Sequence, residues 1–317
     1  SNSDLRSFVQ RNSIFHDNYI HDTGGEGFYV GHTFWPVWNG PTCGGVKITA
    51  YPHAMEGVKI YDNIVEHTGW DAIQLSATRK DGAIFNNIIK NYGTDHNEPQ
   101  AHGIQLSNDI ICSVYNNKIL PVNPGDRSGY SDAIISKAAA SRIFNNLIVN
   151  PGHLVSDATK RKMGIQIYHN GQELPVSSHY ILNNTIINPA RAGISVFYHN
   201  NNIKINNNII VSQTGYYIKD APSGSDTTHN YLTSSIANPG FSDSEYHLSE
   251  NSPCIDAGVN RYAEGVKFDL DNNPRPSSGP FEQGAYEYDG DNPPDPSSWS
   301  LFINAGGNTY NEQEGSE

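Results

Sequence analysis

The stretch Ile84-Phe85-Asn86-Asn87-Ile88-Ile89 shows the pattern that decides the fold. An apolar segment is followed by two positions rich in Asn or Asp, and then by a second apolar segment. Seven copies of this pattern occur, 24 to 45 residues apart, which is about the length of one turn of a β-solenoid. The second polar position of every copy is Asn, at positions 18, 63, 87, 117, 146, 184 and 208.

A single copy is too short to bury its own apolar residues, so neighbouring copies have to stack on one another. Stacked Asn side chains can pass amide hydrogen bonds from rung to rung, and Asn tolerates the left-handed backbone angles of a bend. We therefore interpret the seven Asn residues as scaffold. The short β-branched runs have no 3.6-residue period, which excludes helical repeats. The sequence predicts an all-β chain that forms a right-handed parallel β-helix.

A second kind of strand follows each copy. Its third and fifth residues are mostly apolar and should point inward, because side chains alternate along a strand. The residues between and before them should point outward. These segments are residues 26–30, 71–75, 102–106, 132–136, 163–167, 192–196 and 214–218.

Composition narrows the set of partners. The 33 acidic and 20 basic residues give a net charge of −13, which argues against nucleic acid as a partner. An acidic sugar would need a cation such as calcium to bridge the like charges, so calcium is the one cofactor kept open, and no protein metal site is predicted. No apolar stretch is long enough to span a membrane. The three cysteines lie far apart and are expected to be isolated, buried thiols.

The chain divides into four predicted parts. Residues 1–220 form the β-helix rungs, 221–288 the C-terminal rungs and cap, 289–300 a linker, and 301–317 the start of a further domain. Within the cap, Ser252-Pro253-Cys254-Ile255-Asp256-Ala257-Gly258 and residues 269–276 and 284–288 resemble the C-terminal signature of the choice-of-anchor Q family. That resemblance implies an extracellular or bacterial cell-surface protein.

Two further expectations concern the C-terminal half. Asp269, Asp271 and Asn273 have the spacing of a calcium loop, but the Gly and Glu of an EF-hand are missing, so we predict a structured turn. Residues 301–307 resemble the first strand of a malectin-type carbohydrate-binding domain. This resemblance implies that the chain is a slice of a longer protein whose partner is a polysaccharide. The chain is expected to be a monomer.

One outward column is the main candidate site. It stacks Glu26, Asp71, His102 and Asp132 on successive rungs, which lie about 4.8 Å apart. Carboxylates this close push each other's pKa values apart, as an acid and a base require. Asp71 and Asp132 are two rungs apart, about 9–10 Å, which is near the separation in an inverting glycosidase. The catalytic candidates are these four residues and Lys137, which is expected either to position substrate or to act as a lyase base.

Other outward residues are candidates for substrate binding, because sugar rings stack on aromatic side chains and hydrogen-bond to amides. Two of these candidates, Trp35 and Trp38, belong to the long insertion beside the first rung. The others, on the later strands, are Gln74, Gln105, Tyr168 and His169.

Taken in order, these strands resemble the polygalacturonase family of β-helix glycoside hydrolases. Glu26-Gly27-Phe28, Asp71, His102-Gly103 and Lys137 fall at the family's motif positions. The resemblance implies hydrolysis by paired carboxylates. The sequence departs from the motifs at Trp70, Ala101 and Ile135, which replace an Asp, a Gly and the Arg that would bind a uronate, so the substrate class is left open.

Two hypotheses follow. The first is a carbohydrate-active enzyme, a hydrolase or a lyase, acting on a plant or algal polysaccharide. It requires a groove in which Asp71, His102 and Asp132 converge. The second is a non-catalytic adhesin or glycan-binding stalk, which predicts a flat, solvated face with these groups bonded to local backbone. In that case the carboxylates would be turn caps and Lys137 an ordinary solvated cation.

Overall fold

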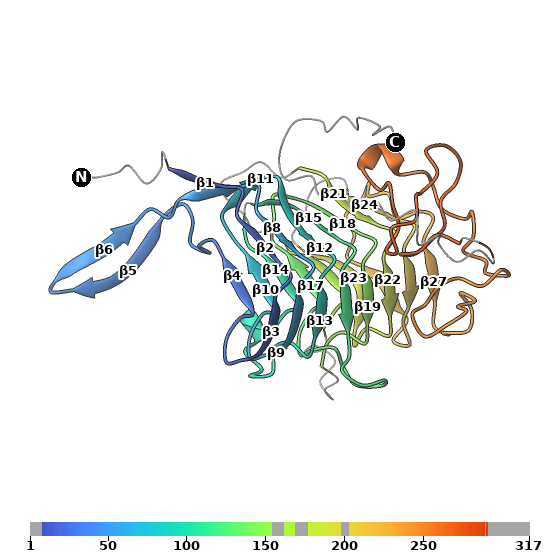
Figure 1. Ribbon diagram of the computed structural model, residues 1–317, viewed down its shortest axis with the longest axis horizontal. Coiled ribbons are helices and arrows are strands. Elements are labelled where there is room, and N and C mark those ends of the chain that lie inside the picture. Colours follow the sequence, from blue (N-terminus) through green and yellow to red (C-terminus); the bar gives the residue numbers. More distant parts are fainter. Residues whose placement is uncertain are drawn as a thin grey trace, which may run out of the picture.

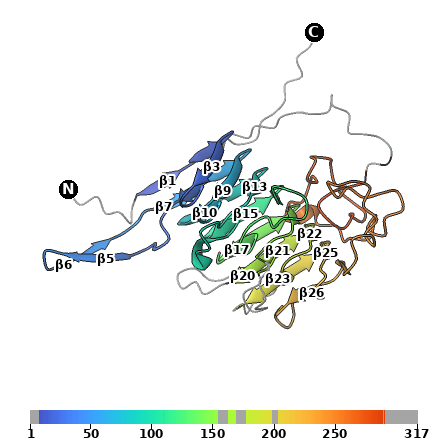
Figure 2. The ribbon, with the colours of Figure 1, turned by 90° about the horizontal axis from the view of Figure 1, so that it is seen from below.

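The computed structural model describes residues 8–108, 110–153, 162–168, 177–197, 203–288 and 290. Strands stack in chain order along one axis, and three long sheets run the length of the stack (Figure 1, Figure 2). Every strand pairing in these three sheets is parallel. The predicted right-handed parallel β-helix is confirmed.

The sheet that carries the candidate column is called the site sheet. In its last strand, the predicted alignment of residues 214–218 with residues 192–196 is wrong by two residues. Ile218, rather than Tyr216, pairs with Ile194, because Thr214 and Gly215 belong to the preceding turn. Its strands, in spatial order, are β4 (Phe28–Val30), β10 (Ile73–Leu75), β14 (Ile104–Leu106), β17 (Ile134–Ser136), β20 (Ile165–Tyr168), β23 (Ala192–Phe197) and β26 (Tyr216–Lys219).

The second and third sheets lie on either side of the Asn bend. The second sheet contains β2 (Ile14–His16), β8 (Lys59–Tyr61), β12 (Gly82–Phe85), β15 (Ile111–Tyr115), β18 (Ala140–Phe144), β21 (His179–Leu182) and β24 (Ile203–Asn206). The third contains β3 (Tyr19–Thr23), β9 (Ile64–Thr68), β13 (Ile88–Lys90), β16 (Lys118–Leu120), β19 (Leu147–Val149), β22 (Thr185–Ile187), β25 (Ile209–Val211) and β27 (Tyr231–Thr233).

Each complete rung therefore has three strands rather than the two that the sequence predicts, because the Asn pair bends the first one. The first residue of the pair takes a left-handed conformation, with φ of 55° at Asn86 and 54° at Asn116. The second residue joins a buried ladder in which Asn87 Nδ2 donates to Asn117 Oδ1 at 2.9 Å. The ladder continues one rung beyond the predicted repeats, to Asn230.

The interior is filled by columns of aliphatic side chains from the three sheets. Ile73, Ile104, Ile134 and Ile165 are fully buried in the site sheet, directly above one another. Each such side chain contributes about 1.5–3 kcal/mol relative to exposure. This repeated core makes the site sheet a rigid platform for the outward column.

Two smaller sheets lie at the N-terminal end of the solenoid. A short sheet joins β1 (Val9–Arg11), β7 (Ala54–Glu56) and β11 (Thr78–Lys80), and the hairpin of β5 (Trp38–Cys43) and β6 (Val46–Ala50) projects from the solenoid (Figure 1). Cys43 is exposed on this hairpin, so the expectation of a buried thiol is wrong there but holds for Cys112 and Cys254. The described helices are the short 3₁₀ turns η1 (Glu98–Gln100) and η3 (Tyr262–Glu264). Neither could cross a membrane.

The described chain after Thr233 is irregular, and it packs along the Asn bends of the solenoid, from Asn116 to Asn207 (Figure 1). Its main tether is Arg275, whose side chain is fully buried and forms an ion pair with Glu287. Arg275 also donates to Asn145 Oδ1 of β18's bend at 3.0 Å and to the Gly284 carbonyl at 3.1 Å. A buried guanidinium that links the two parts in this way holds the C-terminal segment on the Asn bend of the solenoid. The predicted linker and malectin-like segment lie outside the described residues, apart from Gly290.

Asp269 organises the turn that resembles a calcium loop. Its carboxylate accepts hydrogen bonds from the backbone N–H groups of Asp271 at 2.9 Å, Asn273 at 2.7 Å and Glu287 at 2.8 Å. Burial raises the pKa of Asp269 to about 6, against the opposing charge of Arg275. The residues form the structured turn that the sequence predicts.

His247 should make the stability of this cap dependent on pH. Its two ring nitrogens lie 2.6 Å from Asp271 Oδ2 and 2.6 Å from Asp243 Oδ2, and these hydrogen bonds raise the pKa of His247 from 6.5 to about 9. Because the folded pKa exceeds the unfolded one, the stabilisation is complete below about pH 6.5 and is lost as the pH rises through about 9.

Urea unfolding on either side of this window, for wild type and His247→Gln, measures the effect. Wild type should lose more unfolding free energy with rising pH than the variant does. Equal losses in the two proteins would show that the contacts of His247 with Asp243 and Asp271 contribute nothing to the stability.

Candidate functional site

The predicted outward column is present on the site sheet. Ile73, Ile104 and Ile134 pair directly, so Asp71, His102 and Asp132, each two residues earlier, stand above one another. A small residue, Ala72, Gly103 or Ala133, separates each of them from the inward Ile. At Gly103 the adjacent rung is so close that a Cβ would lie 2.6 Å from the Ala133 carbonyl oxygen.

Asp71 is fully buried and holds two other members of the site. Its Oδ1 accepts from the backbone N–H of His102 at 2.7 Å and lies 3.0 Å from His102 Nδ1. Its Oδ2 accepts from Gln105 Nε2 at 2.8 Å. These contacts occupy both carboxylate oxygens, so Asp71 orients His102 and Gln105 from behind.

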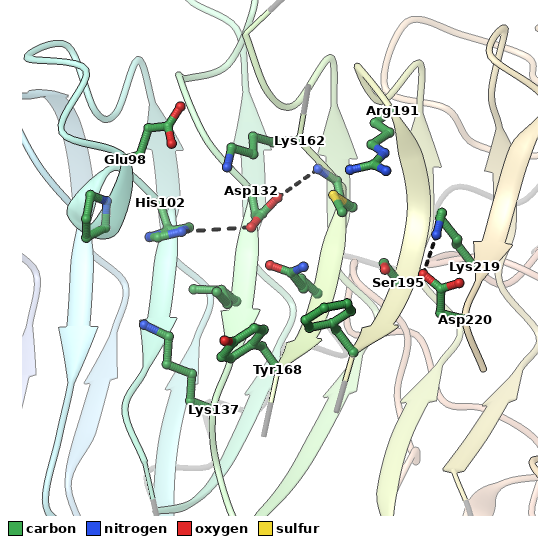
Figure 3. A pocket seen from close by; sticks show the side chains of 15 residues that line it. Glu98, His102, Asp132, Lys137, Lys162, Tyr168, Arg191, Ser195, Lys219 and Asp220 are labelled. Carbon is green, nitrogen blue, oxygen red and sulfur yellow. Dashed lines mark hydrogen bonds and ion pairs between the residues drawn. The ribbon is translucent and has the colours of Figure 1, made fainter. Parts of the chain in front are cut away.

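His102 is placed between two carboxylates. Its Nε2 lies 3.8 Å from Asp132 Oδ2, while Asp132 Oδ1 accepts from the backbone N–H of Met163 at 2.8 Å (Figure 3). The side chains of His102 and Asp132 are 5% and 2% exposed. The structure therefore brings Asp71, His102 and Asp132 into one chain of contacts, with both carboxylates also bonded to backbone.

A cavity of about 500 Å³ opens in front of this chain. His102 and Asp132 line it, whereas Asp71 does not. In Figure 3 the side chains of Lys162 and Arg191 lie on one side of Asp132, and those of Lys137 and Tyr168 on the other. The full lining comprises Glu98, Pro99, His102, Asp132, Ile135, Lys137, Lys162, Met163, Gln166, Tyr168, Arg191, Ser195, Phe197, Lys219 and Asp220.

Cations are concentrated in this pocket. Four of the lining residues are basic and three are acidic, in a chain whose net charge is −13. One of the basic residues, Lys219, forms an ion pair with Asp220 at the far edge. Lys162 and Arg191 stand three residues before Ile165 and Ile194, and so occupy a column beside Asp132. Aligning the rungs at this position would have found them, whereas sequence analysis considered only Lys137.

Lys137 is held at the pocket wall. Its Nζ donates to Gln105 Oε1 at 2.9 Å, and Gln105 in turn donates to Asp71. Burial lowers the pKa of Lys137, although the charges of Asp71 and Asp132 act in the opposite direction. An amine with a lowered pKa loses its proton more readily and is better suited to act as a base near neutral pH.

An aromatic pair forms another part of the wall. The rings of Tyr168 and Phe197 stack with centroids 5.5 Å apart and planes inclined by 16°. Ring surfaces of this kind bind the apolar faces of sugars. The structure thus places Tyr168 in the pocket, while His169 lies outside the described residues.

The remaining predicted residues lie away from this pocket. Glu26 is half-buried and accepts from Gln100 Nε2 at 3.3 Å, and burial, followed by a smaller effect of the Asp71 charge, raises its pKa. Gln74 is buried and donates to Thr33 Oγ1 at 2.7 Å. The Trp35 ring lies 3.8 Å from the Arg79 guanidinium, and Trp38 lines a separate cavity of about 720 Å³ at the N-terminal end.

Calcium was the cofactor left open by the sequence. Within the described ranges, no group of three or more His, Cys, Asp or Glu side chains is arranged to hold a metal ion. The carboxylates of the site already accept backbone and side-chain hydrogen bonds. These residues do not form a calcium-binding site.

Comparison with known proteins places the chain by its fold. No protein-family model matches the sequence, and no curated protein matches it significantly. The structure is similar to the crystal structure of pectate lyase Pel9A, with a TM-score of 0.51 and 12% sequence identity over 89% of this chain and 68% of the other. At this identity the likeness shows the fold alone, and the chain is a parallel β-helix protein of the same architecture as that pectate lyase.

Proposed function

We propose that this chain binds an acidic polysaccharide in the site-sheet pocket and cleaves it by β-elimination. One observation carries the proposal: Lys137, Lys162 and Arg191 line the same pocket as the Tyr168–Phe197 pair, in a strongly acidic chain. Cations gathered in one cleft raise the local concentration of an anionic ligand. Aromatic rings beside them select an anion that is also a sugar.

The substrate class follows from these groups. Lys162 and Arg191 are placed to hold a uronate carboxylate by charge-assisted hydrogen bonds, which Arg forms in a bidentate manner. The ring of the same or the next sugar stacks on Tyr168. The arrangement supplies the positive charge for which the sequence had suggested calcium.

The proposed reaction uses Lys137 as base. The neutral amine takes the proton from the carbon next to the uronate carboxylate. The electron pair of that C–H bond forms a carbon–carbon double bond, and the bond from the adjacent carbon to the glycosidic oxygen breaks. The leaving oxygen takes a proton from water, and the resulting hydroxide takes the proton that Lys137 has accepted. Lys162 and Arg191 stabilise the negative charge that develops on the carboxylate.

Hydrolysis by paired carboxylates is less well supported. The predicted pair, Asp71 and Asp132, would both have to face one substrate, but Asp71 is buried behind His102 and does not line the pocket. We assign Asp71 the role of positioning His102 and Gln105, and Asp132 that of a pocket carboxylate beside His102. The fold neighbour is a pectate lyase by name, which agrees with elimination rather than hydrolysis.

A second candidate is a non-catalytic glycan-binding module at the cell surface. Asp71 and Asp132 each accept a backbone hydrogen bond from the next rung, as purely structural carboxylates would. The same pocket would then bind an acidic glycan without cleaving it. For either function we propose that the protein acts outside the bacterial cell, on the strength of the resemblance at residues 252–288. That it acts as a monomer is a separate proposal.

Product analysis distinguishes these functions. The protein is incubated with pectate, alginate and neutral galactan, with and without calcium. Reducing ends and the ultraviolet absorbance of an unsaturated uronate are then measured. Elimination predicts that both signals rise together on one acidic polymer. Reducing ends without absorbance would indicate a hydrolase, and binding without either signal would indicate the glycan-binding module.

A further inference from the structure

Gln105 makes the most unusual polar contact of the site. It was expected to bind substrate, but its side chain is buried and spans two charged groups. Nε2 donates to Asp71 Oδ2 at 2.8 Å, and Oε1 accepts from Lys137 Nζ at 2.9 Å. The amide orientation is unambiguous, because only its NH₂ can donate to a carboxylate and only its oxygen can accept from an amine.

We propose that Gln105 is a positioning residue, whose amide fixes the direction of the Lys137 amine and keeps the Asp71 carboxylate one side chain away from it. This inference rests on the proposed function. Gln105 itself has no contact with substrate, and acts through Lys137.

The physical reason lies in what the amide does and does not supply. Its oxygen accepts one N–H of Lys137 whether the amine is protonated or neutral, so the side chain stays in place through a proton transfer. It carries no formal charge, and therefore stabilises the ammonium less than a carboxylate at the same distance would. Asp71 in turn prevents the amide from rotating.

The other charged groups near Lys137 do not provide this arrangement. Asp132 and His102 belong to the adjacent contact chain, and Glu98 and Lys162 line the same cavity. Among the described residues, Gln105 is the one whose side chain bonds to the Lys137 amine. Direct ion pairing of Lys137 with Asp71, by contrast, would hold the lysine as an ammonium.

The test measures the pKa of Lys137 without any substrate. The protein is reductively methylated with ¹³C, the Lys137 signal is assigned with Lys137→Arg, and its chemical shift is followed against pH. Gln105→Glu should raise the Lys137 pKa, because the carboxyl pair that it forms with Asp71 brings negative charge directly beside the amine. Asp71→Asn removes a nearby negative charge and should lower it.

Gln74→Glu is the matched control. Gln74 lies in the same column, one rung before Gln105, but it donates to Thr33 instead of Asp71. It should shift the Lys137 pKa much less than Gln105→Glu does. Gln105→Met, which keeps the size of the side chain, should retain the fold while the Lys137 signal broadens or splits. An unchanged Lys137 pKa in folded Gln105→Glu, or equal shifts in both Gln→Glu variants, would overturn the inference.

The outcome is independent of activity. If wild type cleaves no polysaccharide, the proposed function fails while the titration still reports the role of Gln105. If wild type does cleave one, Gln105→Glu should also shift the rise of kcat with pH to higher pH, with little change in KM. A purely structural role of Gln105 would not shift this rise.

Discussion

Lys137→Met should lower kcat on the acidic substrate by about 10²- to 10⁴-fold, the usual contribution of a general base. Wild-type activity should rise with pH through the pKa of Lys137, which burial places below the ordinary lysine value. The rise occurs because the neutral amine, not the ammonium, accepts the proton. Steady-state kinetics across pH, with the absorbance of the unsaturated product, measure both effects.

Lys137→Arg is the matched control. It keeps the positive charge at the pocket wall but cannot act as a base near neutral pH, since the guanidinium stays protonated. It should therefore lose kcat as Lys137→Met does, while KM changes less. Near-wild-type kcat in either variant would remove Lys137 from the chemistry, and loss through KM alone would make it a binding residue.

Asn117→Ala should lower the free energy of unfolding by about 4 kcal/mol or more. Asn117 Nδ2 donates to the Ile84 and Tyr115 carbonyls and to Asn146 Oδ1, at 3.0 Å in each case. Its Oδ1 accepts from the backbone N–H of Asn87 at 3.0 Å. Alanine would leave several of these fully buried groups without partners, at about 1–3 kcal/mol each.

Asn18→Ala serves as the control for the ladder. Asn18 begins the described ladder and is exposed, so water can replace the hydrogen bonds that it donates. Its cost should stay within about 1 kcal/mol. Urea unfolding followed by circular dichroism gives both values. Similar losses at the two positions would contradict the burial argument.

The fold could be predicted because its cause is local and repeated. Each Asn pair encodes the same bend, and each following segment alternates inward and outward side chains, so seven copies state the same rule. The repeat did not show that the bend divides each first strand into two strands, because a pair such as Asn86-Asn87 is also compatible with a polar interruption of a single strand. It also missed the last ladder position, Asn230, because the residues before it, Thr228 and His229, break the pattern.

The site could be predicted only in part. Counting residues back from each inward Ile placed Asp71, His102 and Asp132 in one column, and the structure stacks them there. Counting cannot reveal depth: Asp71 lies behind His102, and Gln105 reaches sideways to Lys137 rather than outward. Lys162 and Arg191 were missed because they stand three residues before the inward Ile, one position outside the column that was counted.

The most direct test of the central claim is a comparison of two ligands that differ only in their carboxylates. Isothermal titration calorimetry of Lys137→Arg with oligogalacturonate, oligomannuronate and oligoguluronate is compared with titration of their carboxyl-reduced forms. We predict that one acidic oligosaccharide binds at least about tenfold more tightly than its reduced form, and that Arg191→Met abolishes this difference. Equal affinity for acidic and reduced forms, or no binding of any acidic oligosaccharide, would contradict the account.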